Sequence, residues 1–143
     1  MRISDILSTK GTDVVTVEKS ATVREALACL AEHGIGALVV SSDSHTIDGI
    51  VSERDVVRQL HQRGPGLLDA TVESIMSAPV HTCAPDDGPE QVMATMTNER
   101  VRHVPVVATG ELRGLVSIGD VVKSRIDALE ADHRVLVEYI SAR

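Results

Sequence analysis

Residues 49–57 read GIVSERDVV and residues 114–122 read GLVSIGDVV, so a glycine, two apolar residues, a serine and an aspartate recur in the same order. The stretches before them also match, because residues 35–40 read IGALVV and residues 101–106 read VRHVPV. Each copy spans roughly 55–60 residues, which is too long for one unit of a solenoid and suits a small α/β half-domain. Two copies therefore account for nearly all of the 143-residue chain.

Both copies predict the same order of elements. In the first, apolar periodicity and turn residues predict a strand at 14–17, a helix between Thr22 and Gly34, strands at 38–40 and 50–51, and a helix over 53–63. In the second, they predict a strand at 80–83, a helix from Asp87 through Met96, strands at 101–107 and 115–116, and a helix onward from Gly119. We therefore expect an α/β fold with two β-α-β-β-α repeats at 1–63 and 72–126, a linker at 64–71, and a C-terminal helical extension at 127–143.

The composition restricts both the core and the partners. Tyr139 is the single aromatic residue, so the core must be aliphatic and no aromatic platform for single-stranded nucleic acid exists. The net charge of −7 also argues against nucleic acid, which binds to basic surfaces. No stretch is apolar enough for a signal peptide or a membrane span. Since Cys29 and Cys83 lack CxxC spacing, we expect a cytoplasmic protein with reduced thiols.

The paired junctions point to a known family. Two β-α-β-β-α copies, each with the glycine-to-aspartate junction, resemble a tandem pair of CBS domains, also called a Bateman module, over nearly the whole chain. The resemblance implies two repeats related by a pseudo-two-fold axis, with two clefts between them. In this family such clefts commonly bind adenosine-containing ligands such as AMP, ADP, ATP, S-adenosylmethionine or NAD, and the pairs typically associate as homodimers.

Each junction has a chemical and a purely structural interpretation. Ser52 and Ser117 are expected at helix starts, where free N–H groups and the helix dipole favour a phosphate. Asp55 and Asp120, three residues on, can accept hydrogen bonds from the two hydroxyls of a ribose. Ser-x-x-Asp is also a capping box, which satisfies the helix start without any ligand. For the pair in matching context, we expect ligand contact in at least one cleft.

The two copies differ where a phosphate would bind. The second copy has Arg102 and His103 where the first has Gly36 and Ala37. By resemblance to CBS pairs that bind adenylates, these positions face the cleft, and an arginine there can hold a phosphate through two hydrogen bonds. We therefore expect the Asp120 cleft to be the better phosphate site. The candidate ligand-binding residues are Ile35, Gly36, Ala37, Ser52, Arg54, Asp55, Val101, Arg102, His103, Ser117 and Asp120.

In detail, a small apolar base pocket formed by Ile35, Gly36 and Ala37 is expected to complete the Asp120 cleft. Arg54 is expected in the Asp55 cleft, where Glu53 beside it would oppose a phosphate. The expected function is a regulatory or sensor module that binds an adenosine nucleotide, with no other cofactor and an unknown downstream target protein. The alternative is a ligand-free homodimerisation scaffold, in which both Ser-x-x-Asp units only cap helices.

Other chemistry has little support. His81 and Cys83 share a strand face that His103 could approach, but no fourth zinc ligand is evident, so we expect no metal site. No catalytic triad, Walker or dinucleotide-binding motif occurs, so we do not expect an enzyme.

The C-terminal region carries a repeating apolar pattern. Its members are spaced alternately by four and three residues, which is heptad spacing over about three heptads: Val122, Ile126, Leu129, His133, Leu136 and Ile140. The pattern indicates either a seam between two copies of the chain or a helix packed on its own domain.

Overall fold

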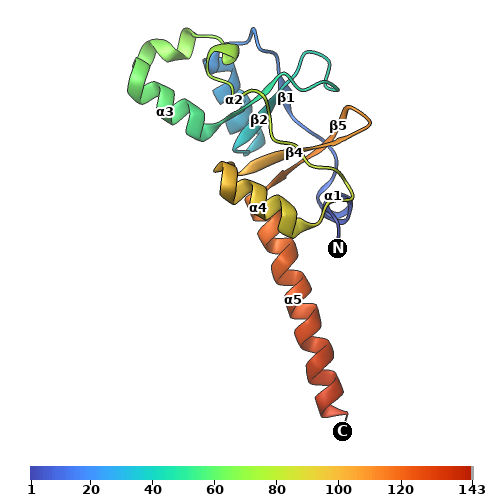
Figure 1. Cartoon of the computed structure of the whole chain (residues 1–143). Helices are drawn as coiled ribbons and strands as arrows, with labels where there is room; N and C mark the ends of the chain where they lie inside the picture. The colour runs from blue at the N-terminus through green and yellow to red at the C-terminus, as the bar shows by residue number, and fades with distance from the viewer. Residues whose placement is uncertain (143) are drawn as a thin grey trace.

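The computed structural model describes residues 1–142, and its elements follow the predicted order of two α/β halves (Figure 1). The first half contains α1 (Ile3–Lys10), β1 (Thr16–Val17), α2 (Val23–His33), β2 (Ala37–Val40), β3 (Gly49–Ser52) and α3 (Glu53–Arg63). Two short 3-10 helices follow, η1 (Pro65–Asp69) and η2 (Val72–Ser74). The second half contains α4 (Pro89–Glu99), β4 (His103–Ala108), β5 (Glu111–Ser117) and α5 (Ile118–Ser141), which projects from the body of the molecule.

Each half is built on a small sheet with matching register. In the first, β1 runs parallel to β2 and β2 runs antiparallel to β3, with Ala37 opposite Ser52. In the second, β4 and β5 are antiparallel, with His103 opposite Ser117. The two serines therefore lie at equivalent places, where a strand ends and a helix begins.

The helix boundaries of the first half were largely predictable from local sequence. Thr22 caps α2 by accepting a 3.1 Å hydrogen bond from the backbone N–H of Glu25, as the capping-box spacing predicts. Gly34 ends the same helix in the left-handed conformation, with a φ of 61°. The helix expected over 53–63 is confirmed by α3.

The structure differs from local expectation at three places. The strand expected at 80–83 is reduced to one isolated bridge between Cys83 and Val106. Pro85 lacks the N–H group that would extend this bridge along the chain. The segment expected as a linker, 64–71, contains η1, which places Leu67 in the first core at 1% exposure. Helix α1 was not predicted, although its Ile3, Ile6 and Leu7 are all buried.

Each hydrophobic core is completed by a segment from the other half of the chain. The core around β2, β3 and α2 also contains Val72 and Ile75, which come after the first repeat. The core around β4, β5 and α4 contains Ile3, Ile6 and Leu7 from α1. This exchange holds the two halves face to face without a continuous sheet between them.

The glycines that open the two junctions make room for the exchanged segments. A Cβ built on Gly114 would lie 2.7 Å from a methyl carbon of Leu7. One built on Gly49 would lie 2.6 Å from the sulfur of Met76. Leu7 ends the stretch SDIL at residues 4–7 and Met76 ends the similar stretch ESIM at residues 73–76, so the two occupy matching places. The glycines are therefore required for close packing.

Replacing Gly114 with alanine should destabilise the fold, because Leu7 is buried and cannot move away freely. Overpacking of this kind typically costs about 1–3 kcal/mol in the free energy of unfolding. Gly66→Ala is the matched control, since nothing lies within 4 Å of the Cβ it would add. Urea unfolding of both variants measures the difference, and equal stabilities would contradict this account of Gly114.

Candidate functional site

Both Ser-x-x-Asp junctions form the complete capping boxes of the structural interpretation. Asp55 Oδ2 accepts hydrogen bonds from the backbone N–H and the hydroxyl of Ser52, at 2.8 and 3.0 Å. Asp120 Oδ2 accepts the equivalent bonds from Ser117, at 2.8 and 2.9 Å. The two junctions make the same hydrogen bonds, so the side chains around them are what distinguish the two clefts.

A cavity of about 510 Å³ lies next to Asp55, between α3 and the segment that joins α4 to β4. This volume falls within the ~300–1,000 Å³ typical of small-molecule sites. Its lining comes from both halves of the chain: Gly36, Ile50, Ser52, Glu53, Arg54, Asp55, Arg58, Ser77, Glu99, Arg100, Val101, Arg102 and His103. Seven of the eleven sequence-predicted residues thus line one cavity.

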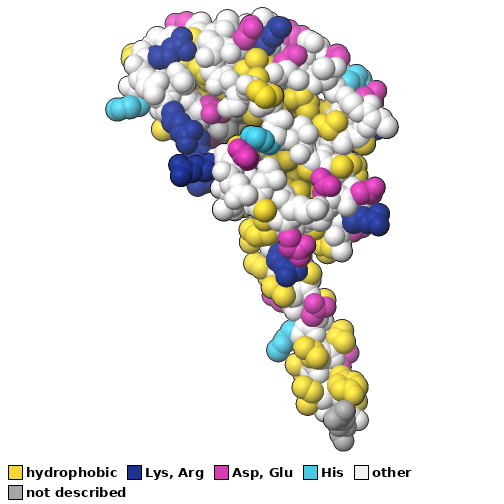
Figure 2. Space-filling view, in the orientation of Figure 1, with side chains coloured by type: hydrophobic (Ala, Val, Ile, Leu, Met, Phe, Trp, Pro, Cys, Tyr) yellow, Lys and Arg dark blue, Asp and Glu magenta, His cyan; other side chains and the backbone are white. Residues whose placement is uncertain are grey.

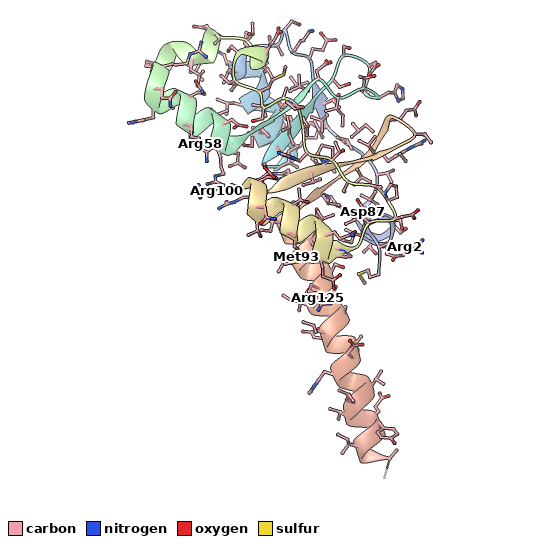
Figure 3. All side chains as sticks on the ribbon, viewed as in Figure 1. Arg2, Arg58, Asp87, Met93, Arg100 and Arg125 are labelled. Carbon is pink, nitrogen blue, oxygen red and sulfur yellow. The ribbon has the colours of Figure 1, made fainter. Side chains whose placement is uncertain are left out.

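Four arginines distinguish this cavity from the rest of an acidic protein. Arg54 and Arg58 lie one turn apart on α3, while Arg100 and Arg102 lie in the segment between α4 and β4. Among residues 1–142, no hydrogen bond or ion pair engages any of these four guanidinium groups. Figure 2 shows basic side chains gathered at this edge, and Figure 3 shows Arg58 on α3 and Arg100 after α4 at the same edge.

His103 links the two halves at the inner end of the cavity. A Cβ built on Gly36 would lie 3.4 Å from the His103 ring and 3.0 Å from the Glu53 carboxylate. Burial, followed by the positive charge of Lys10, lowers the pKa of His103 below its usual value of 6.5, although Asp120 and Glu53 act in the opposite direction. His103 therefore takes up a proton less readily than a free histidine, even though the carboxylates of Asp120 and Glu53 favour its protonated form.

The surroundings of Asp120 are different, because Lys10 neutralises its carboxylate. The Lys10 ammonium donates to Asp120 Oδ2 at 2.5 Å and to the backbone carbonyl of Leu115 at 2.7 Å. Partial burial raises the pKa of Asp120, but the bonds from Lys10 and Ser117 outweigh this effect and leave it below the usual value. A smaller hollow of about 310 Å³ adjoins Asp120 and is lined by α1 and α5.

The assignment of Arg102 to the Asp120 cleft is wrong, because Arg102 lines the cavity of Asp55. Arg102 precedes β4, and the path of the chain there turns its side chain toward α3 of the other half. The base pocket expected in the Asp120 cleft also changes place. Gly36 lines the Asp55 cavity, Ala37 is buried within β2, and Ile35 packs against the first core.

Several residues of the candidate site were not expected from the sequence. Arg58 follows Arg54 by one helical turn, which is a signal that helical spacing could have provided. Arg100 adopts a left-handed conformation at the end of α4, with a φ of 55°. The partnership of Lys10 with Asp120 joins residues 110 positions apart, and no local pattern predicts it.

The structure offers no metal cluster in the part of the chain it describes, residues 1–142. His81 lies 3.5 Å from the Glu99 carboxylate, and Cys83 lies in the second core. Burial, with the nearby charge of Asp87, raises the pKa of the Cys83 thiol to about 12. Within the same residues, no helix has the length and apolar character needed to cross a membrane.

Comparison with known proteins identifies the family. The CBS domain model matches the chain twice, at residues 3–62 and 72–127, so the chain belongs to the CBS domain family and the resemblance is confirmed. A CBS-domain containing protein of Agrobacterium tumefaciens superposes with a TM-score of 0.85 at 41% identity, covering 87% of this chain and 99% of that one.

Two similar structures contain adenosine compounds. A CBS domain protein of Pyrobaculum aerophilum, complexed with AMP, has a TM-score of 0.73 at 32% identity and covers 84% of this chain and 89% of its own. A CBS domain pair in complex with 5′-methylthioadenosine and S-adenosyl-L-methionine has a TM-score of 0.77 at 25% identity, covering 91% and 98%. The family thus includes pairs that take adenosyl ligands.

The lowered pKa of His103 predicts a specific pH dependence of stability. The unfolded chain binds a proton at His103 more readily than the folded chain, so stability is full above about pH 6.5 and falls as the pH decreases below it. His103→Gln should therefore have a shallower loss of stability between pH 7 and 5 than the wild type. Denaturant unfolding at each pH measures these slopes.

His61→Gln is the control, because His61 is exposed on α3. It should keep the wild-type slope. If the His103 variant has that slope as well, burial of the imidazole does not control the acid sensitivity.

Proposed function

We propose that this protein is a regulatory module that binds a phosphorylated adenosine ligand in the cavity of Asp55. The observation that carries the proposal is the set of four arginines around one cavity, none of which has an ion-pair partner among residues 1–142. Isolated charges of one sign cost free energy when they are held close together, and a bound anion offsets that cost. The four arginines also outnumber the three carboxylates of the lining, Glu53, Asp55 and Glu99.

Three sets of groups around the cavity suit the three parts of such a ligand, its phosphates, its ribose and its adenine. The guanidinium groups and the N-terminus of α3 at Ser52 suit the phosphates. Asp55 Oδ1, which accepts no hydrogen bond from residues 1–142, suits the hydroxyls of a ribose. Ile50 and Val101 provide apolar surface for an adenine, since the chain has no aromatic ring in the cavity.

We place the phosphorylated ligand in the Asp55 cavity in preference to the Asp120 cleft. The earlier expectation ranked them in the opposite order because it assigned Arg102 to Asp120. Lys10 already neutralises the Asp120 carboxylate, and the hollow beside Asp120 contains none of the arginines. A ligand at Asp120 would have to compete with an ion pair that the chain itself supplies.

Ligand binding here would connect the two halves of the molecule. Arg54 and Arg58 belong to the first half, and Arg100 and Arg102 belong to the second. A phosphate group held by both pairs favours whichever relative position of the halves brings them closest, which is a shift of population between conformations. This is the physical basis for a regulatory role, with a downstream target protein and a homodimer as further parts of the proposal.

A thermal-shift panel tests the proposal against the scaffold alternative. AMP, ADP, ATP, NAD, S-adenosylmethionine and adenosine are each added to the full chain at millimolar concentration. A ligand at one hundred times its Kd adds about 2.7 kcal/mol of stability, so binding should raise the Tm clearly. We expect phosphorylated ligands to raise the Tm more than adenosine does. A flat response across the panel would favour the scaffold, in which both junctions serve only as caps.

Substitutions at the two aspartates locate the ligand. Asp55→Asn keeps a capping side chain but loses the charge that strengthens hydrogen bonds to ribose, which should cost about 1.5–3 kcal/mol of affinity. Asp120→Asn is the matched control and should leave the affinity nearly unchanged. Calorimetry with the best ligand of the panel measures both, and a larger loss at Asp120 would reverse our placement.

Arg102 provides a second comparison in the same assay. Arg102→Ala should lower the affinity for a phosphorylated ligand by roughly ten-fold or more, because it removes a charged pair of hydrogen-bond donors from the phosphate. Arg24→Ala is the control, since Arg24 pairs with Asp69 at the surface, away from the cavity. Similar affinities for the two variants would show that Arg102 does not contact the phosphate.

A further inference from the structure

Helix α5 exposes far more apolar surface than any other element. Within the helix, only Val121 and Ser124 are buried. Of the twelve large hydrophobic side chains exposed in residues 1–142, nine lie on α5: Ile118, Val122, Ile126, Leu129, Val135, Leu136, Val137, Tyr139 and Ile140. Figure 2 shows this apolar surface along the projecting helix. A helix with so little packing is marginal in water, so α5 requires a partner for most of its length.

The exposed side chains include a continuous seam, which we define as Val122, Ile126, Leu129, His133, Leu136 and Ile140. The body of the molecule contacts the side of the helix next to this seam, through Val121, Ser124 and an ion pair of 2.9 Å between Arg125 and Glu90 on α4. Exposure along the seam rises from 37% at Val122 to 69% at Ile140. Beyond Val122, at least half of each hydrophobic seam side chain is exposed, so its own domain does not cover this part of the seam.

The charges of α5 argue against a membrane as the partner. Its polar residues comprise five acids and three bases: Asp120, Asp127, Glu130, Asp132, Glu138, Lys123, Arg125 and Arg134. Helices that lie on membrane surfaces are rich in lysine and arginine and use tryptophan or phenylalanine as anchors. Because α5 is acidic and lacks both aromatics, a second helix of protein suits the seam better.

We propose that the seam joins a second copy of this chain in a parallel, in-register, two-stranded coiled coil. Heptad spacing places Ile126, His133 and Ile140 at position a, and Val122, Leu129 and Leu136 at position d. Isoleucine at a with leucine at d favours two parallel strands, and a single polar residue at a fixes the register. His133 is that polar residue.

The flanking charges are self-complementary in this arrangement. Arg125 occupies position g and Glu130 position e, five residues further on. In a parallel coiled coil, position g of one helix lies beside the following position e of its partner. Arg125 therefore pairs with Glu130 of the partner subunit, and the symmetry of the dimer gives a second, equivalent pair. The second pair, Asp132 with Val137 of the partner subunit, contains no like charges.

Antiparallel arrangements satisfy these residues less well. One antiparallel register keeps all six seam residues of each helix in contact with seam residues of the other helix. In that register, Asp132 lies opposite Asp132 of the partner subunit and Glu130 lies opposite Glu130 of the partner subunit. Like charges at these positions are unfavourable. Antiparallel registers shifted by one heptad separate these like charges, but they keep only four of the six seam residues in contact. Only the parallel register keeps all six seam residues in contact and also places attractive or neutral pairs at positions e and g.

Disulfide trapping tests the direction of the helices in the full chain. Ile140→Cys should give a crosslinked dimer under mild oxidation, because in-register position a residues meet across a parallel seam. Glu138→Cys is the control, since position f faces away from the partner helix. The wild-type chain shows how much crosslinking occurs through the native Cys29 and Cys83. The proposal is overturned if Ile140→Cys does not crosslink, or if it crosslinks only with a second variant, Val122→Cys, as an antiparallel seam requires.

A charge exchange tests the register. By sedimentation equilibrium, Arg125→Glu should weaken the dimer at least ten-fold, and adding Glu130→Arg should restore most of that loss. Glu90→Gln controls for the ion pair within the chain and should leave the dimer unchanged. A wild-type chain that is monomeric at tens of micromolar, or a double variant no better than Arg125→Glu, would overturn the proposal. Neither result depends on nucleotide binding.

Discussion

The exchange of segments between the two cores is the constraint on which the rest of the structure depends. Leu7 crosses from the N-terminus to pack on Gly114, and Met76 crosses from the start of the second half to pack on Gly49. Since each sheet is too small to stand alone, neither half has a complete core without the other. The face-to-face arrangement of the halves follows, and with it a cavity that both halves line.

The repeat gives the two junctions one backbone geometry, but the side chains make them unequal. Three residues after Leu7 the chain has Lys10, which neutralises Asp120, whereas three residues after Met76 it has Pro79, which carries no charge. The same asymmetry continues at Arg102, which reaches across to the first half. One aspartate is thus paired with a lysine of the chain, while the other lies in a cavity lined by four arginines that no hydrogen bond or ion pair engages among residues 1–142.

Helix α5 differs in its energetics from the body it leaves. The body buries its aliphatic side chains in two cores, whereas α5 leaves the seam exposed after its first turns. Within one sequence, the spacing of apolar residues therefore indicates two kinds of contact. The irregular spacing of the repeats suits packing within the chain, and the regular heptads of α5 suit packing between chains.

The sequence by itself determined the repeat, the order of the elements and both Ser-x-x-Asp junctions, because these depend on local spacing and capping chemistry. It also singled out Arg102 and His103, but it could not assign Arg102 to a cavity. That assignment depends on the direction in which the chain turns between α4 and β4, and on contacts between residues far apart in sequence. The pairing of Lys10 with Asp120, across 110 residues, was decided only when the exchange of segments brought α1 against the second half. Local sequence patterns cannot predict such a contact, because it arises from the packing of α1 into a core formed by residues far away in the sequence.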